Sequence, residues 1–332
     1  MRLLVTGGAG FIGSNFVHYW VDRYPDDHLV VYDLLTYAGN RANLVDVEGR
    51  TVFVQGDIGD NELVRAVLGR EKIDVVVNFA AESHNSLAVV DPTRFFRTNV
   101  LGTQTLLDAS RAAGVTRFHH VSTCEVYGEL ALDSEEVFTE DSPYRPRTPY
   151  NASKAGADHA VRAYFETFGL PVTITNCSNN YGPYQFPEKV IPLFTTNALD
   201  DEPLPLYAST SNRREWLHVL DHCAAIDLVL RNGGEGETYN VGSGLEASIE
   251  EVADLVLELT GRPASLKTIV PDRPGHDRRY LLDAGKIRRE LGWEPSHGWR
   301  EGLAETIEWY ASHRDWWEPL KERAPVEETA WR

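Results

Sequence analysis

Apolar residues in the first half of the chain form short runs that alternate with longer stretches of helical spacing. The short runs predict strands at residues 3–7, 29–33, 51–57, 74–81 and 117–123 and from residue 172. Almost every residue in these runs is apolar, so we expect strands that are covered on both faces. Between them, helical periodicity covers residues 11–24, 61–70 and 98–114. Strand alternating with helix predicts an α/β fold with a doubly wound parallel sheet.

The second half of the chain has a different pattern. Prolines cluster beyond about residue 183 and the periodicity becomes irregular, with helical stretches at residues 248–261 and 299–317. We therefore predict a Rossmann-type domain over residues 1–182 and a smaller mixed α/β substrate domain over residues 183–332. Some strands and helices of the second part are expected to return to the Rossmann sheet.

Charge and cysteine content exclude several classes of protein. The formal net charge of −18 over 332 residues argues against a nucleic-acid partner, because a phosphate backbone requires a basic surface. We see no run of about 18 apolar residues, which a membrane span needs. Cys124, Cys177 and Cys223 lie far apart and lack metal-ligand spacing. This cysteine pattern predicts a cytoplasmic protein with neither a disulfide framework nor a metal site.

A glycine-rich turn follows the first predicted strand, in the sequence TGGAGFIG at residues 6–13. Glycines let the backbone approach a pyrophosphate, and the helix that follows offers free N–H groups to it. Asp33 lies 20 residues after Gly13, at the spacing of an acid that binds the ribose and disfavours the extra phosphate of NADP. NAD is therefore the predicted cofactor. Its predicted contacts are Gly7, Gly10, Phe11, Ile12, Gly13, Asp33, Asp57, Ile58, Ala80, Tyr150 and Lys154.

A tyrosine and a lysine suited to base catalysis are four residues apart, in Tyr150-Asn151-Ala152-Ser153-Lys154. On a helix this spacing places both side chains on one face. A lysine beside a tyrosine lowers the pKa of the phenol, which then acts as a base near neutral pH. Thr123 ends the preceding predicted strand and is positioned to hold the oxygen that is oxidised. Behind a dinucleotide turn, this pattern resembles the extended short-chain dehydrogenase/reductase family, whose members mostly modify nucleotide sugars.

Further motifs sharpen the resemblance over nearly the whole chain. They are AAESH at 80–84, STCEVYG at 122–128, NCSNNYGP at 176–183, FPEKVIP at 186–192, LPLY at 204–207 and RPGHDRRY at 273–280. In these segments the chain resembles the dTDP-glucose 4,6-dehydratase family. The resemblance implies oxidation of the sugar at C4 by a tightly held NAD, removal of the C5 proton by Glu125, and loss of the C6 hydroxyl. Hydride then returns to C6, so that NAD is regenerated in each turnover.

The chain departs from the family pattern at two places. Cys124 stands where the family has the aspartic acid that protonates the departing hydroxyl, and residues 85–88 read Asn-Ser-Leu-Ala instead of the typical Val-Asp-Arg-Ser. Both segments are expected to line the sugar end of the pocket. Cys124 is therefore either a substitute acid, at a cost in rate, or a small buried apolar residue. The predicted catalytic residues are Thr123, Cys124, Glu125, Tyr150 and Lys154.

Other functions stay open because of the missing aspartate. Hydride return to C4 after water loss gives a 5,6-unsaturated sugar, as in related enzymes that also carry a cysteine before the glutamate. Reduction of the 4-keto sugar without water loss gives a 4-epimerase, which the retained Glu125 disfavours. A dehydrogenase that releases NADH does not need Glu125. A catalytically silent nucleotide-sugar-binding protein does not need the other catalytic residues.

The resemblance also implies how the nucleotide sugar is bound, whether linked to thymidine or uridine diphosphate. The predicted substrate contacts are Ser83, His84, Asn180, Lys189, Val190, Pro205, Tyr207, Arg214, Arg273 and His276, with Arg278 as an alternative phosphate ligand to Arg273. A homodimer is expected, in which residues 100–113 and the helix that carries Tyr150 form a four-helix bundle with their counterparts.

Overall fold

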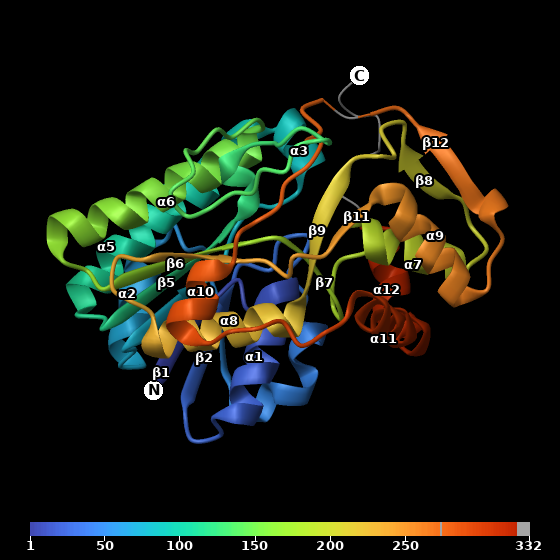
Figure 1. Ribbon diagram of the computed structural model, residues 1–332. Coiled ribbons are helices and arrows are strands. Elements are labelled where there is room, and N and C mark those ends of the chain that lie inside the picture. The colour runs from blue at the N-terminus through green and yellow to red at the C-terminus, as the bar shows by residue number, and fades with distance from the viewer. Residues whose placement is uncertain (273, 324–332) are drawn as a thin grey trace.

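A parallel sheet forms the centre of the computed structural model, which describes residues 1–272 and 274–323 (Figure 1). In the described residues this sheet has seven strands in the order β10-β6-β5-β4-β1-β2-β3, and each pairs in parallel with its neighbours. The strands are β1 (Arg2–Thr6), β2 (His28–Asp33), β3 (Val52–Gln55), β4 (Val75–Asn78), β5 (Arg117–Thr123), β6 (Val172–Cys177) and β10 (Thr238–Val241). The sequence prediction of a doubly wound parallel sheet is confirmed.

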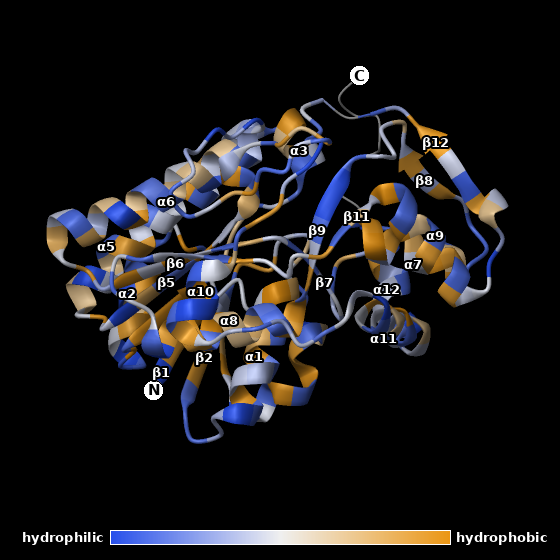
Figure 2. Ribbon diagram, in the orientation of Figure 1, coloured by the Kyte–Doolittle hydropathy of each residue, from blue (hydrophilic) through white to orange (hydrophobic). Residues whose placement is uncertain are grey.

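Helices cover both faces of this sheet, because successive residues of a strand point to opposite sides. On one face Leu3 and Val5 of β1 pack with α1 and α8, whereas Leu4 packs on the other face with α2, α5 and α6. Figure 2 shows hydrophobic residues in β2 and α1 where they meet. The helices are α1 (Phe11–Arg23), α8 (Val219–Asn232), α2 (Asn61–Arg70), α5 (Thr103–Ala113) and α6 (Pro149–Phe168).

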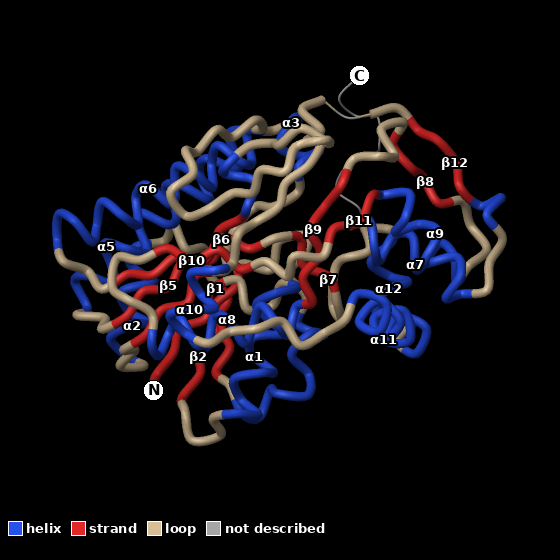
Figure 3. Tube along the Cα trace, in the orientation of Figure 1, coloured by secondary structure: helices blue, strands red, loops and turns tan. Residues whose placement is uncertain are grey.

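A smaller unit lies beside the carboxyl ends of the central strands, on the right in Figures 1 and 3. Its two small sheets have the orders β11-β9-β7 and β12-β8. Its strands are β7 (Asn179–Tyr181), β8 (Leu204–Tyr207), β9 (Arg213–His218), β11 (Glu246–Ser248) and β12 (Lys267–Val270). Its helices are α7 (Val190–Leu199), α9 (Ile249–Thr260), α11 (Trp299–Ser312) and α12 (Arg314–Lys321). Buried side chains of α7, α9 and α11 form one apolar cluster with β8.

Two sequence expectations about helices need correction. The predicted helix 98–114 begins as a π-helix, η2 (Phe96–Gly102), and only then continues as α5. The predicted helix 299–317 is two helices, because the backbone leaves helical geometry at His313 (φ −123°, ψ 44°). After residue 183, as the sequence analysis expects, part of the chain returns to the central sheet, since β10 pairs with β6. Among the described residues, no helix is long and apolar enough to cross a bilayer.

Candidate active site

One large cavity lies at the carboxyl ends of the central strands and extends to β8 and β9 of the smaller unit. Its volume is about 630 Å³. It is lined by the whole set of predicted cofactor contacts and by Thr123 and Glu125. The predicted substrate contacts that line it are Ser83, His84, Asn180, Lys189, Val190, Pro205, Tyr207, Arg214 and His276. Arg273 lies outside the described residues.

The glycine turn between β1 and α1 fits a dinucleotide. Gly7 has φ +66°, and a Cβ there would lie 2.6 Å from the Ala80 nitrogen. A Cβ on Gly13 would overlap the carbonyl oxygen of Gly7. Gly10 caps α1 without a side-chain hydrogen bond, so no side chain blocks the N–H groups of the first turn. This turn therefore has the close backbone approach and the exposed helix dipole that a pyrophosphate needs.

Asp33 ends β2 and lines the same end of the cavity. Its Oδ2 accepts the N–H of Ala9 at 2.9 Å and its Oδ1 accepts that of Leu35 at 2.8 Å. Burial raises the pKa of Asp33, although both hydrogen bonds oppose the rise. Each oxygen keeps a lone pair for a ribose hydroxyl. The predicted cofactor contacts Asp57 and Ile58 lie after β3, which ends at Gln55 and not at residue 57 as predicted.

The proposed base, Tyr150, lies close to Thr123, Cys124 and Glu125. Tyr150 lies in the first turn of α6, and its phenol is hydrogen-bonded to the hydroxyl of Thr123, the last residue of β5. Burial raises the pKa of Tyr150 well above 10, and the charge of Glu125 adds to the rise. The sequence led us to expect a lowered pKa, because it showed the nearby lysine but neither the burial nor the closeness of Glu125.

Lys154 is held by groups that the sequence reasoning missed. Its Nζ donates to the carbonyl oxygen of Val121 at 2.7 Å and lies 3.3 Å from Nε2 of His120. That Nε2 is 3.4 Å from a carboxylate oxygen of the buried Asp158. Burial lowers the pKa of Lys154, and Asp158 opposes this effect. Asp158 follows Lys154 at i+4 on α6, and this spacing is a signal that points to it.

Cys124 differs from the other catalytic candidates because it is absent from the described residues that line the cavity. It is 1% exposed and packs in an apolar cluster with Val126, Tyr127, Ala155 and Leu282. Burial raises the pKa of its thiol well above 9. This environment favours the interpretation of Cys124 as a buried apolar residue. At the other departure from the family pattern, Asn85 and Ser86 do line the cavity.

Cations and a buried glutamate surround the substrate end of the cavity. The Arg214 guanidinium donates to the carbonyl oxygen of Asp277 at 2.7 Å and lies 4.8 Å from the ring centre of Tyr280. Lys189 lies 3.5 Å from Glu188. Burial opposes ionisation of Glu188, but Lys189 and a hydrogen bond from His84 hold its pKa below the usual value. Glu188 was missed although it stands beside Lys189 in the FPEKVIP motif.

Arg278 does not reach this cavity. Its guanidinium pairs with Glu129 at 2.9 Å, and it is not among the lining residues that the structure describes. The alternative assignment of Arg278 as a phosphate ligand is therefore not supported by its position.

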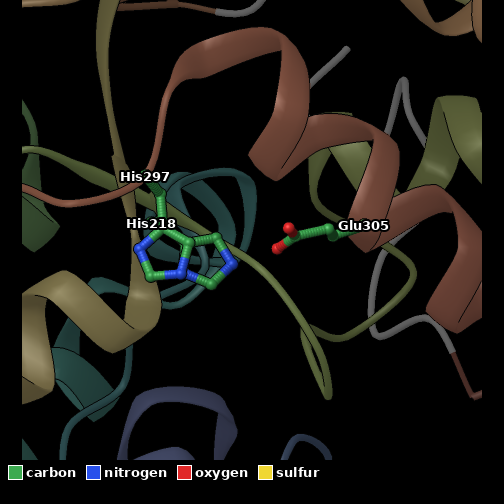
Figure 4. Close-up of side chains that lie close together, drawn as sticks. All are labelled: His218, His297 and Glu305. Carbon is green, nitrogen blue, oxygen red and sulfur yellow. The ribbon is translucent and has the colours of Figure 1, made fainter.

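A second group of ionisable side chains, outside the cavity, consists of His218, His297 and Glu305 (Figure 4). The two imidazole rings are stacked, with centroids 3.9 Å apart and planes 22° apart. A metal ion lies in the plane of each imidazole that binds it, and nearly parallel stacked rings do not share such a position. Nδ1 of His218 also accepts the N–H of Leu220 at 3.3 Å, which leaves the proton on the other nitrogen. We assign no metal site here.

Comparison with protein families tests the family resemblance that the sequence motifs indicated. A model of the family described as GDP-mannose 4,6 dehydratase matches residues 4–306. The chain belongs to this family. Its relatives include the dTDP-glucose 4,6-dehydratase of Mycobacterium tuberculosis strain H37Rv, 50% identical over 97% of both chains.

Solved structures of family members share the fold over almost the full length. The dTDP-glucose 4,6-dehydratase DesIV from Streptomyces venezuelae, crystallised with NAD, is 53% identical, with a TM-score of 0.92 over 96% of this chain and 100% of that one. A UDP-glucose 4-epimerase from Thermotoga maritima still has a TM-score of 0.88 at 29% identity, over 94% of this chain and 99% of that one. The fold alone therefore does not separate dehydratase from epimerase, and the site residues must do so.

Proposed function

We propose that this chain is an NAD-dependent nucleotide-sugar dehydratase that converts dTDP-glucose into its 4-keto-6-deoxy product. The observation that carries the proposal is that Thr123, Glu125 and Tyr150 line the same cavity as the glycine turn. An epimerase needs the tyrosine and the cofactor but has no use for a carboxylate at C5. Relatives about 50% identical over 97% of the chain bear the name dTDP-glucose 4,6-dehydratase.

The cofactor end is assigned to residues that already fit NAD. The glycine turn holds the pyrophosphate against the start of α1, and Asp33 binds the adenosine ribose. NAD bound there would supply the acceptor for a hydride from C4 of the sugar and, once reduced, the donor of a hydride to C6. Tyr150 takes the proton of the C4 hydroxyl, while Thr123 holds that oxygen by hydrogen bonding. The raised pKa of Tyr150 makes its phenolate, once formed, a stronger base for this proton.

Glu125 carries the elimination. The C4 ketone acidifies the C5 proton, which moves to the carboxylate of Glu125. The C6–O bond breaks, the C6 oxygen leaves as water, and a C5=C6 double bond forms. Cys124 is buried away from the cavity lining, so Glu125 is the side chain that returns the proton to the leaving oxygen. A proton from solvent at C5 and a hydride at C6 then complete the 4-keto-6-deoxy sugar, while the proton that Tyr150 took from the C4 hydroxyl passes to solvent.

The cellular setting and assembly belong to the same proposal. We place the protein in the cytoplasm, where its three free cysteines stay reduced. We also propose a homodimer that uses α5 and α6. Its support is that Phe96, Leu101 and Phe168, on or next to these helices, are exposed by 43%, 61% and 49%. Sedimentation equilibrium of the purified chain tests the dimer.

Product analysis tests the reaction. Purified protein is incubated with dTDP-glucose, and in parallel with UDP-glucose and UDP-N-acetylglucosamine, and the products are examined by NMR. We expect a new C6 methyl group and a C4 ketone or its hydrate from dTDP-glucose. Exocyclic vinyl protons would instead identify a 5,6-dehydratase, and a C4-inverted sugar without water loss would identify an epimerase. Either result would overturn the proposed reaction.

A further inference from the structure

Asn85 makes a direct polar contact with the proposed C5 base. It is the first residue of α3 (Asn85–Val90) and lines the cavity. Its Nδ2 donates to Oε2 of Glu125 at 3.2 Å. In residues 1–272 and 274–323, no hydrogen bond of the structure engages the other carboxylate oxygen of Glu125. Asn85 therefore distinguishes the two oxygens and leaves Oε1 for proton transfer.

The orientation of the Asn85 amide is determined by Thr148, which caps α6. The Thr148 Oγ1 accepts the N–H of Asn151 at 3.2 Å, so its own proton is available for Asn85 Oδ1, which lies 3.2 Å away. This places the amide oxygen toward Thr148 and the NH₂ group toward Glu125. The opposite orientation would put an amide oxygen against a carboxylate, which is repulsive. Two contacts thus select the same orientation.

The chain of donors links the start of the catalytic helix to the base. It runs from the Asn151 N–H to Thr148, from the Thr148 hydroxyl to Asn85, and from the Asn85 amide to Glu125. Tyr150 lies in the same first turn of α6, between Thr148 and Asn151. The turn that carries the C4 base is therefore joined by hydrogen bonds to the carboxylate that acts at C5.

We propose that Asn85 is a positioning residue for C5 deprotonation. Its hydrogen bond fixes the position of the Glu125 carboxylate relative to Tyr150. This role rests on the proposed function, because it assumes that Glu125 removes the C5 proton. C4 oxidation depends on Tyr150 and Thr123, and Asn85 has no place in that step. Loss of Asn85 should therefore separate the two half-reactions.

The Asn85→Asp variant tests this role, because it keeps the size and the acceptor for Thr148 but replaces the donor by a like charge. Nicotinamide absorbance reports C4 oxidation, and deuterium uptake at C5 from D₂O reports deprotonation. We expect C5 exchange to fall by about 10-fold to 100-fold, since small misplacements of a reacting group have effects of this order. C4 oxidation should change less than about threefold, so that reduced cofactor accumulates.

The matched control is Asn61→Asp, the same change at the first residue of another helix, α2. The Asn61 side chain accepts a hydrogen bond from Arg65 and does not line the cavity. It should leave both rates unchanged. Equal loss of C4 oxidation and C5 exchange in Asn85→Asp, or exchange at the wild-type rate, overturns the role of Asn85. A wild-type protein that shows neither C5 exchange nor water loss overturns the proposed function itself, and with it this inference.

Thr148 offers a second route to the same result. Thr148→Val removes the hydroxyl that orients Asn85, whereas Thr148→Ser keeps it. We expect Val to lower C5 exchange selectively and Ser to restore it. Because Thr148 also caps α6, thermal unfolding of both variants separates loss of fold from loss of orientation. A Ser variant as impaired as Val, at equal stability, contradicts the donor chain.

Discussion

The two ends of the cavity depend on different parts of the polypeptide. At the cofactor end, the shape comes from the backbone: glycines permit the turn after β1, and an uncapped helix start faces the cavity. At the sugar end, the chemistry comes from side chains, where Asn85 faces Glu125 and Cys124 packs away from the cavity. The departures from the family pattern gather at the sugar end. Backbone requirements tolerate little change, whereas side chains at the sugar end are replaced while the fold is kept.

The strongest test of this contrast removes the base at the sugar end. Tyr150→Phe deletes one hydroxyl that is hydrogen-bonded to Thr123 and leaves the backbone unchanged. We expect turnover to fall by about 10² to 10⁴, the usual value of a general acid–base group. NAD and nucleotide-sugar affinities, measured by calorimetry, should stay within about threefold. A large loss of NAD binding would show that the two ends are not separable in this way.

At the cofactor end, a single methyl group should be enough to disturb binding. In Gly13→Ala the new Cβ would overlap the Gly7 carbonyl oxygen, so the turn must shift. We expect a loss of about 1–3 kcal/mol in stability, and weaker NAD binding. Gly69→Ala is the control, because a Cβ there, in α2, meets nothing within 4 Å. It should gain about 0.5–1 kcal/mol through helix propensity. Thermal unfolding with and without NAD measures both variants, and equal behaviour would contradict the backbone argument.

This contrast also explains what the sequence predicts well. Strand runs, the glycine turn and the acid at Asp33 depend on local pattern and spacing, and the structure places them as expected. The orientation of Cys124, the hydrogen bond from Asn85 and the His120–Asp158 pair depend on contacts between distant segments. A one-dimensional pattern contains no information about which side of a short turn faces a cavity. The break between α11 and α12 at His313 was likewise not predictable, because the sequence has aromatic residues on both sides of it.

A buried carboxyl on β9 predicts a pH effect on stability. Glu215 on β9 accepts the N–H groups of Gly244 and Leu282, and burial raises its pKa from 4.5 to about 7. The folded chain therefore binds this proton more tightly than the unfolded chain does. Stability should fall as pH rises from about 4.5 to about 7, by at most about 3 kcal/mol, and level off above.

Chemical denaturation across this pH range measures the slope. Glu215→Gln should flatten the slope, even though the amide keeps only one of the two acceptors and lowers stability overall. Glu235→Gln, at an exposed position, should keep the wild-type slope. A wild-type slope in Glu215→Gln would mean that another group titrates.

The smallest expected effect is at Cys124, and it tests the central claim that the sugar end works without an acid at this position. Cys124→Ala removes a sulfur from an apolar cluster and should lower stability by about 1 kcal/mol. The decisive measurement is the rate at which this variant forms the C6 methyl product from dTDP-glucose, followed by NMR beside the wild type. We predict a decrease of less than about tenfold with the same product; a decrease of about 10² to 10⁴, the value of a lost general acid, would contradict the assignment of Cys124 as a packing residue.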